Sequence, residues 1–258
     1  MTMNIRKALI TSAGLGTRMR PVTSKVPKAM LPIFDKGDGK IRVIPVVDKI
    51  MDNLRETGVR KFCFVVDSKK KLLREYLLES GKDAVFVYQR KAKGFGDAVM
   101  RGASFVGNEP FFLCTDDNLM TGGYREGARA FRKLKMDCLL FLKKTDSPER
   151  YGIASGKETL AFEGHMLMKI TDVEEKPSSP KSDLAIIGVY IFSPKIFAEL
   201  RKIGDEMKDG KEKQLTPGIQ NLVKGNNVYG MILEEEEWLD VGNPEDYFQS
   251  LNYSYNSI

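Results

Sequence analysis

The stretch KALITSAGLGTRMRPVTSKVPKAMLPI, Lys7–Ile33, sets the reading of this sequence. It begins with a short apolar run, Ala8–Ile10, that is typical of a buried strand and ends in a turn containing Gly14 and Gly16. Four cations follow among three prolines: Arg18, Arg20, Lys25 and Lys28. Glycines let a backbone approach a ligand closely, and cations beside a strand end favour a polyphosphate. The stretch predicts an extended phosphate-binding loop, although a plain strand-to-helix turn would also use glycine.

The rest of the first half alternates short apolar runs with amphipathic stretches. The apolar runs are KFCFVVD (61–67), AVFVYQ (84–89), PFFLCTD (110–116) and CLLFLK (138–143). The amphipathic stretches are Pro45–Thr57, Lys69–Ser80, Gly96–Phe105 and Tyr124–Leu134. This alternation predicts buried parallel strands joined by helices, and therefore an α/β fold with a Rossmann-like, doubly wound, mostly parallel sheet. In such sheets, ligands bind in the loops that follow the strands.

The pattern changes after about Leu142. Three further runs, YGIAS (151–155), MLMKITDVEEK (166–176) and LAIIGVYIF (184–192), indicate strands without regular helices between them. Helices are predicted at about Pro194–Lys202 and Pro217–Lys224, then a strand at 228–233 and a last helix from about Pro244. No internal repeat or low-complexity linker divides the chain. We therefore predict one domain over residues 1–258, with halves of about 1–145 and about 146–258.

Composition narrows the class of partner. The 258 residues carry a net charge of +6, but lysines and arginines are spread along the chain, so nucleic acid is not an expected partner. The longest apolar stretch, Leu184–Phe192, is too short to span a bilayer, and the N-terminus lacks a signal-peptide pattern. The three cysteines, Cys63, Cys114 and Cys138, each lie in an apolar run, as reduced buried thiols do. We expect a cytoplasmic protein with no membrane partner.

Two common glycine motifs do not account for the N-terminal loop. The dinucleotide-binding fingerprint requires glycine or alanine at its last position, where this chain has Met19. The P-loop pattern, which ends in lysine followed by serine or threonine, does not occur in the sequence. A phosphate site would therefore use the backbone at Gly14 and Gly16, with further donors from Thr17 and Arg18.

As a whole, the loop resembles the signature of the sugar-1-phosphate nucleotidyltransferases, G-x-G-T-R-(x)-x-P-x-T-x-x-x-P-K-x-M-L-P. The matching residues are Gly14, Gly16, Thr17, Arg18, Pro21, Thr23, Pro27, Lys28, Met30, Leu31 and Pro32. Later stretches follow in the order of that family: FVYQRKAKGFGDAV (86–99), PFFLCTDDNLM (110–120), RYGIAS (150–155) with VEEKP (173–177), and WLDVGNPEDY (238–247). The resemblance covers nearly the whole chain. Within the family it is greatest to bacterial-type UTP–glucose-1-phosphate uridylyltransferases.

This resemblance implies an enzyme with a Rossmann-like nucleotide-binding half and a sugar-binding half that ends in a closing helix. Its partners would be a nucleoside triphosphate and a sugar-1-phosphate. An oxygen of glucose-1-phosphate would attack the α-phosphorus of UTP, with Mg²⁺ as cofactor, giving UDP-glucose and pyrophosphate. The same chemistry with dTTP (a glucose-1-phosphate thymidylyltransferase) or another sugar phosphate stays open, as does a non-catalytic sugar-nucleotide-binding regulator. Members of this family often form dimers or tetramers, so a homo-oligomer is also possible.

The resemblance also assigns roles to single residues. Arg18 would bind the β- and γ-phosphates, and Lys28 would bind the α-phosphate and the transition state. Asp116 and Asp240 would hold Mg²⁺, a hard cation that takes one or two carboxylates together with substrate phosphates. The residues that would bind the nucleotide are Ala13, Gly14, Gly16, Thr17, Gln89 and Gly94, of which Gln89 and Gly94 would read the base. The residues that would bind the sugar phosphate are Gly152, Glu175 and Lys176.

Several of these residues have a structural alternative. Arg18 and Lys28 could be surface charges, and Asp116 could cap a helix that begins after its strand. Asp117 could contact a sugar hydroxyl or begin that same helix. Trp238 and Tyr247 would serve in packing. A glycosyltransferase of related fold would carry an Asp-x-Asp metal motif, which the sequence Asp116-Asp117-Asn118 does not supply.

Three departures from the family pattern qualify the resemblance. The stretch DKGDGK, 35–40, is longer than the usual connection, which could alter a loop near the site or an oligomer contact. Asp97 occupies a position where the family commonly has histidine or glutamine. Asp183 occupies a position where the uridylyltransferases often have asparagine, so a contact to a sugar hydroxyl is in question there.

Overall fold

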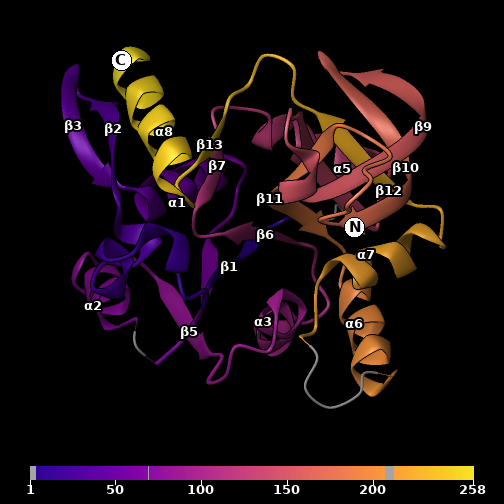
Figure 1. The fold of residues 1–258 in the computed structure, drawn as a ribbon, viewed down its shortest axis with the longest axis horizontal. Helices are drawn as coiled ribbons and strands as arrows, with labels where there is room; N and C mark the ends of the chain where they lie inside the picture. Colours follow the sequence, from indigo (N-terminus) through magenta and orange to yellow (C-terminus); the bar gives the residue numbers. More distant parts are fainter. Residues whose placement is uncertain (1–3, 69, 207–211) are drawn as a thin grey trace.

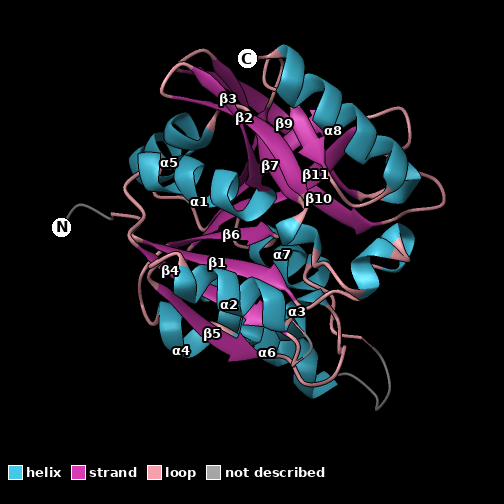
Figure 2. Cartoon of the chain, turned by 90° about the vertical axis from the view of Figure 1, so that its left-hand side faces the viewer, coloured by secondary structure: helices cyan, strands magenta, loops and turns pink. Residues whose placement is uncertain are grey.

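In residues 4–68, 70–206 and 212–258, which the computed structural model describes, a sheet of nine strands forms the centre of the fold (Figure 1). The order of its strands is β5-β4-β1-β6-β11-β8-β12-β10-β9. Helices lie on both sides of this sheet, as Figure 2 shows. The predicted α/β fold with a doubly wound, mostly parallel sheet is confirmed.

The first four strands in this order are parallel neighbours. They are β5 (Ala84–Tyr88), β4 (Lys61–Val66), β1 (Lys7–Ser12) and β6 (Phe111–Thr115), and all four coincide with predicted apolar runs. Parallel strands end on the same edge of a sheet, so the loops that follow β1, β5 and β6 lie together. The prediction that β5 is buried is wrong, because β5 is the edge strand and leaves Val85 46% exposed.

The second half of the chain inserts a strand into the middle of the sheet. β11 (Leu184–Phe192) lies between β6 and β8 (Cys138–Lys144), antiparallel to both, and each of its residues is buried. β12 (Val228–Ile232) runs parallel to β8, and the hairpin of β9 (Gly152–Phe162) and β10 (His165–Glu175) completes the sheet. One continuous sheet therefore contains strands from both halves of the chain.

Alternating side chains of each strand face two hydrophobic clusters, one on each side of the sheet. On β1, for example, Ile10 belongs to one cluster and Leu9 to the other. The first cluster is covered by α1 (Val46–Glu56), α2 (Lys71–Glu79) and α5 (Tyr124–Lys133). The second is covered by α3 (Phe95–Arg101), α4 (Ala103–Val106), α6 (Lys195–Glu206) and α7 (Thr216–Val223).

The helices differ from their predicted bounds at a few points. The stretch predicted as one helix, Gly96–Phe105, forms two, α3 and α4, which meet at Gly102. A Cβ at Gly102 would lie 2.4 Å from Leu9 Cδ1, so the glycine lets this junction rest directly on β1. Position 69 of the predicted helix 69–80 lies outside the described residues, and α2 begins at Lys71. Among the described helices, none has the length and apolar character needed to cross a membrane.

Two small two-stranded ribbons were not predicted from the sequence, whereas the last helix was. β2 (Pro32–Gly37) and β3 (Lys40–Pro45) form a hairpin that contains the long stretch 35–40, so this stretch is part of a ribbon and not an irregular loop. β7 (Asn118–Met120) pairs with β13 (Trp238–Asp240). α8 (Pro244–Asn256), predicted from Pro244, packs against β2 (Figure 1).

A buried carboxylate fastens the hairpin to α1. Asp35, only 8% exposed, accepts hydrogen bonds from Arg42 Nε and from Lys49 Nζ, both at 2.8 Å. Burial opposes ionisation of Asp35, but the hydrogen bonds and charges of Lys49 and Arg42 outweigh it and hold the pKa below its ordinary 3.8. The ionised carboxylate therefore stabilises the folded chain at neutral pH.

We predict that Asp35→Asn lowers the free energy of unfolding by about 1–2 kcal/mol at pH 7, because a neutral amide replaces a paired, buried carboxylate. The folded pKa is depressed, so this stabilisation is present above the unfolded pKa and is lost as pH falls through the folded pKa. Urea unfolding at pH 7, 5 and 3 should show the difference between the two proteins shrinking at the lowest pH. Asp52→Asn, which removes an exposed carboxylate paired with Arg55 on α1, is the control and should change little. An equal loss at every pH would contradict the role of the charge.

Candidate active site

The loop after β1 folds back on itself. The sequence predicted an extended segment, whereas the structure has three one-turn helices, Thr17–Met19, Val22–Ser24 and Lys28–Met30. Gly16 has a φ of 61°, and a Cβ there would lie 3.0 Å from Thr23 Cβ. Thr23 Oγ1 donates a hydrogen bond to Gly16 O at 2.6 Å. Glycine at position 16 thus permits both the left-handed backbone and the close approach that hold the loop in shape.

All six residues predicted to bind the nucleotide line one cleft, which has a volume of about 310 Å³. It is lined by Thr11, Ala13, Gly14, Leu15, Gly16, Thr17, Gln89, Ala92, Gly94, Phe95, Ala98 and Glu212. The cleft lies where β1 and β5 end and where α3 begins. Apart from Gly14 and its two chain neighbours, no atom of the described residues lies within 4 Å of the place where a Cβ of Gly14 would be, so the backbone is open to the cleft at that point.

The turn at Gly94 is held by the segment before α7. Gly94 has a φ of 94°, and a Cβ there would lie 2.4 Å from Lys213 O. Gly96 N donates to Lys213 O at 2.7 Å, and Lys213 N donates to Lys93 O at 2.7 Å. Gln89, 6% exposed, donates from Nε2 to Gly94 O at 3.0 Å. The wall predicted to read the base is therefore a rigid, hydrogen-bonded turn.

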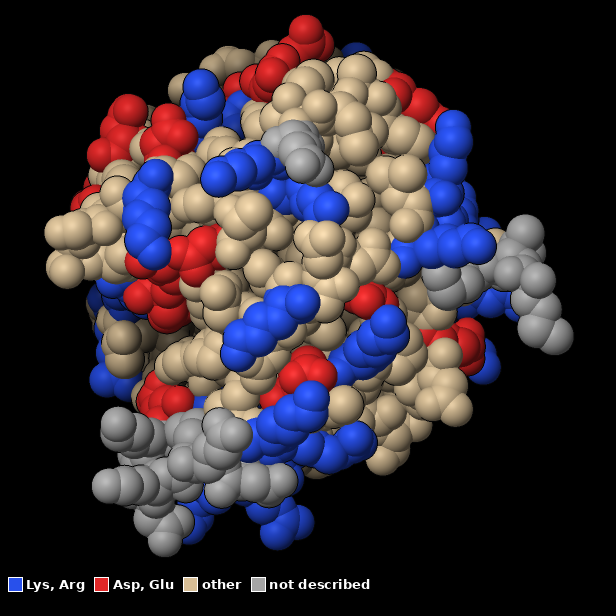
Figure 3. Space-filling view, turned by 90° about the vertical axis from the view of Figure 1, so that its right-hand side faces the viewer, with Lys and Arg blue, Asp and Glu red and all other residues tan. Residues whose placement is uncertain are grey.

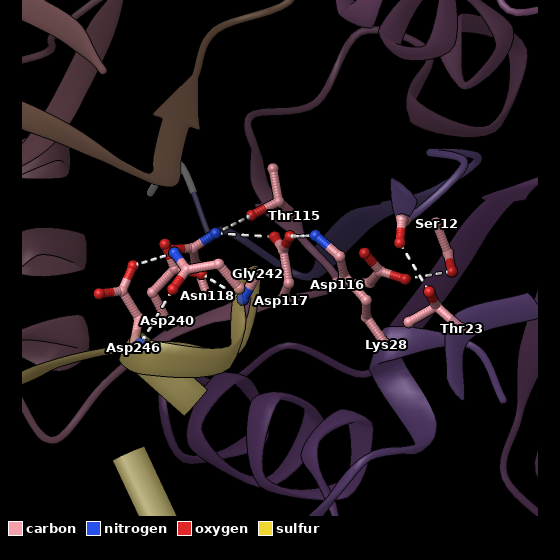
Figure 4. A network of polar contacts seen from close by, with 12 residues as sticks. Ser12, Thr23, Lys28, Thr115, Asp116, Asp117, Asn118, Asp240, Gly242 and Asp246 are labelled. Carbon is pink, nitrogen blue, oxygen red and sulfur yellow. Dashed lines mark hydrogen bonds and ion pairs between the residues drawn. The ribbon is translucent and has the colours of Figure 1, made fainter. Parts of the chain in front are cut away.

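Three aspartates gather beside the loop (Figure 4): Asp116 and Asp240 are buried, and Asp117 is partly buried. Asp116 follows β6 and accepts a hydrogen bond from Ser12 Oγ, while Asp240 ends β13 and accepts one from Gly242 N at 2.6 Å. Asp117 accepts a hydrogen bond from Lys28 Nζ at 2.7 Å. No helix begins after Asp116, since β7 follows, so the alternative of a helix cap for Asp116 or Asp117 is wrong.

The environments of the three carboxylates differ. Burial raises the pKa of Asp116, and the neighbouring Asp117 raises it further. Burial also raises the pKa of Asp240 to about 6, with Asp117 again adding to the shift. At Asp117, burial is outweighed by Lys28, and the pKa is lowered. The protein therefore supplies a cation to Asp117 but leaves Asp116 and Asp240 in surroundings where a further positive charge would stabilise them.

This donor set fits Mg²⁺ with part of its ligands supplied by a substrate. Among the described residues, no group of three or more His, Cys, Asp or Glu side chains is arranged to hold a metal by itself. Mg²⁺ prefers oxygen ligands and is commonly bound through one or two carboxylates together with substrate phosphates. Asp116 and Asp240, each less than 10% exposed, have the chemistry for such a site.

The two cations predicted to bind the phosphates of the nucleotide differ in burial. Lys28 is buried, and its Nζ would lie 3.3 Å from a Cβ at Gly242, which brings the loop against the segment after β13. Lys28 is therefore not a surface charge. Arg18 is exposed and has no ion-pair partner in the described part of the chain. Burial, followed by the charges of Asp246 and Asp240, raises the pKa of Tyr151. The charge of Arg18, like that of Arg150, acts in the opposite direction.

The three residues predicted to bind the sugar phosphate also lie together. Gly152 is opposite Glu175 in the β9–β10 pair, and Lys176 N donates to Tyr151 O at 3.0 Å. Thr216 Oγ1, at the start of α7, donates to Glu175 Oε2 at 2.5 Å. Tyr190 of β11 connects this group with the cleft. The centroid of its ring lies 6.3 Å from the ring centroid of Phe95. Burial raises the pKa of Tyr190, and the charge of Glu175 raises it further.

A chain of polar contacts around the aspartates was not foreseen from the sequence. Trp238 Nε1 donates to Asn118 Oδ1 at 2.6 Å, and Asn118 Nδ2 donates to Asp117 Oδ1 at 2.7 Å. Trp238, expected only to pack, thus also orients Asn118, and its ring meets that of Tyr151 edge-on at 4.8 Å. The consecutive residues Asp117 and Asn118 were visible in the sequence, but their partners on β13 and in the N-terminal loop were not.

Comparison with known proteins gives a consistent result. A family model described as nucleotidyl transferase matches residues 7–256. A UTP–glucose-1-phosphate uridylyltransferase of Bacillus subtilis is 31% identical over 268 residues, covering 92% of this chain and 87% of the relative. A glucose-1-phosphate thymidylyltransferase of Streptomyces griseus is 29% identical, covering 94% of this chain and 64% of the relative.

A solved structure extends this likeness to the fold. The crystal structure of a UDP-glucose pyrophosphorylase complexed with UDP-glucose is similar to this chain with a TM-score of 0.83 and 27% identity, covering 98% of this chain and all of the other. The resemblance seen in the N-terminal loop is confirmed by a match that extends almost from end to end. The chain is an enzyme that belongs to the nucleotidyl transferase family.

Proposed function

We propose that this enzyme transfers the uridylyl group of UTP to glucose-1-phosphate, giving UDP-glucose and pyrophosphate. The observation that carries the proposal is the meeting of three groups at one edge of the sheet. These groups are the glycine-lined cleft, the cluster of Lys28 with Asp116, Asp117 and Asp240, and the pair Glu175 and Lys176. The uridylyltransferase names of similar proteins support UTP and glucose-1-phosphate as the reactants.

In this mechanism the protein binds, aligns and neutralises two polyanions. The phosphate of glucose-1-phosphate is already ionised, so its attack on the α-phosphorus of UTP needs no general base. Lys28, held by Asp117, would sit at the α-phosphate and stabilise the charge of the in-line transition state. Arg18 would bind the leaving pyrophosphate, and Lys176 would bind the phosphate of the sugar. Mg²⁺, held by Asp116 and Asp240, would neutralise charge on the phosphates of the nucleotide.

A second candidate is the same transfer from dTTP. It is favoured by the thymidylyltransferase of Streptomyces griseus, whose identity of 29% is close to that of the uridylyltransferases.

The face of the molecule in Figure 3 shows lysines and arginines interspersed with acidic residues, which agrees with small anionic reactants. A cytoplasmic location, the absence of a nucleic-acid partner and assembly into a homo-oligomer stay predictions.

The proposal predicts that pyrophosphate is released only when Mg²⁺, UTP and glucose-1-phosphate are all present. The measurement is pyrophosphate release with UTP, dTTP, CTP, ATP and GTP, each with and without glucose-1-phosphate. Release with dTTP and not with UTP would establish the second candidate instead. Binding of a sugar nucleotide without release from any pair of substrates would overturn transfer and favour a regulatory protein.

We predict that Asp240→Asn lowers kcat at least about a hundredfold, because an amide is a poor ligand for a hard cation and Mg²⁺ neutralises charge in the transition state. The fold should persist, since an asparagine oxygen can still accept the hydrogen bond from Gly242 N. The measurement is the Mg²⁺ dependence of pyrophosphate release together with thermal unfolding. Asp146→Asn, in an exposed loop, is the matched control. A rate near that of the wild type would exclude Asp240 as a metal ligand.

We predict that Lys28→Met lowers both stability and kcat, because it leaves the partly buried Asp117 without its cation and removes a charge from the transition state. The double variant Lys28→Met/Asp117→Asn separates the two effects. It should recover stability, since the unpaired charge is gone, while kcat stays about a hundredfold or more below wild type. Lys25→Met, exposed in the same loop, should change neither quantity. Recovery of kcat in the double variant would show that Lys28 acts only through folding.

A further inference from the structure

The amide of Gln89 is held in one orientation by two hydrogen-bond acceptors. Its Nε2 donates to Gly94 O at 3.0 Å and to Asp97 Oδ2 at 2.9 Å. A carbonyl and a carboxylate can only accept, so turning the amide over would place Gln89 Oε1 against two acceptors. Both Nε2 hydrogens are therefore used within the protein. No described residue donates to Oε1, which is the polar atom that Gln89 has left to offer the cleft.

Asp97 is itself held firmly in place. It lies in the first turn of α3, where a negative charge is favourable, and its side chain is only 14% exposed. Arg101, one turn further along, donates from Nη2 to Asp97 Oδ1 at 3.0 Å. An ionised carboxylate offers only hydrogen-bond acceptors. The contacts of Gln89 with Gly94 O and with the Asp97 carboxylate therefore fix the direction of one amide at the wall of the cleft, and Arg101 pairs with that carboxylate without contacting Gln89.

The cleft offers the base few other polar contacts on this side. The lining residues contributed by the end of β5, by α3 and by their connection are Gln89, Ala92, Gly94, Phe95 and Ala98. Among these, Gln89 alone has a polar side chain. Its orientation therefore decides whether this wall presents an acceptor or a donor to whatever enters.

We propose that Asp97 is a positioning residue for base selection: it turns the acceptor of Gln89 toward the base, so that the enzyme prefers bases with a ring N–H over bases with a bare ring nitrogen. Uracil and thymine carry an N–H at N3, whereas cytosine has an acceptor there. The proposal rests on the proposed function, in which this cleft receives the base. It accounts for a carboxylate at position 97 and treats UTP and dTTP alike.

The test is the binding of UTP and of CTP, with Mg²⁺ and without sugar phosphate, measured by titration calorimetry on the wild type and two variants. Asp97→Asn keeps the size of the side chain but gives it a donor, which can accommodate a turned Gln89 amide. Arg101→Gln is the matched control, because it removes the ion pair and leaves the carboxylate. Thermal unfolding of each variant checks the fold.

We expect the wild type to bind UTP at least about tenfold more tightly than CTP. With CTP, the acceptor of Gln89 would face the acceptor N3 of cytosine, and both polar atoms would be left without a hydrogen-bond partner. Asp97→Asn should reduce this ratio at least about fivefold, mainly by tightening CTP and weakening UTP, and Arg101→Gln should leave it within about twofold. An unchanged ratio in Asp97→Asn, an equal loss for both nucleotides, or no preference in the wild type would each overturn the proposal. Failure of the proposed function is distinguishable, because it appears as absent pyrophosphate release and does not alter the binding ratio.

Discussion

The largely buried ion pair between Lys28 and Asp117 is the contact on which the arrangement of the site depends. It joins the loop after β1 to the turn after β6, two segments far apart in the chain, at a distance of 2.7 Å. Gly242, which follows β13, lies directly against both charges. Separating the pair would leave a charge buried without compensation, which costs several kcal/mol in typical proteins. The loop after β1, the turn after β6 and the segment after β13 are therefore held in one arrangement relative to each other.

This pairing also gives three neighbouring carboxylates different electrostatic surroundings. Asp117 forms a salt bridge with Lys28 and has a lowered pKa, whereas Asp116 and Asp240 have raised pKa values and, in the part of the chain that the structure describes, no salt bridge to a lysine or arginine. In the proposed function, the positive charge that these two carboxylates favour would be a Mg²⁺ ion bound together with the nucleotide. The salt bridge to Asp117 holds Lys28 in position, so that Asp116 and Asp240 are not needed to place the lysine.

Much of the fold and of the site could be predicted from local patterns. Runs such as Phe111–Thr115 are apolar enough to be strands in any context, and the spacing of Gly14, Gly16, Arg18 and Lys28 is specific enough to identify the family. The residues that line the cleft follow from that identity. The β2–β3 hairpin was missed, although Asp38 and Gly39, with φ values of 50° and 74°, form the kind of two-residue turn that an Asp-Gly pair indicates.

What local patterns could not show are contacts that exist only after the strands have assembled. Asp117 pairs with Lys28, and Trp238 donates to Asn118, across 89 and 120 positions of sequence. Asp97 was visible as a departure from the family, but the role proposed for it depends on where Gln89 points. The exposure of β5 depends on its being the edge strand, which the order of the sheet decides and the composition of the strand does not.

The position of β11 has a consequence for how the chain acquires its structure. β6 can pair with β1 as soon as the first 115 residues exist, but its other edge is covered by β11, which ends at Phe192. During synthesis from the N-terminus, an apolar strand with an open edge must therefore wait while the intervening segments are made. Folding of the central sheet then depends on a contact between segments far apart in the chain, which makes it slow. Until that contact forms, the open edge of β6 can pair with a wrong strand. The same insertion that unites the two halves in one sheet prevents the first half from being a finished unit.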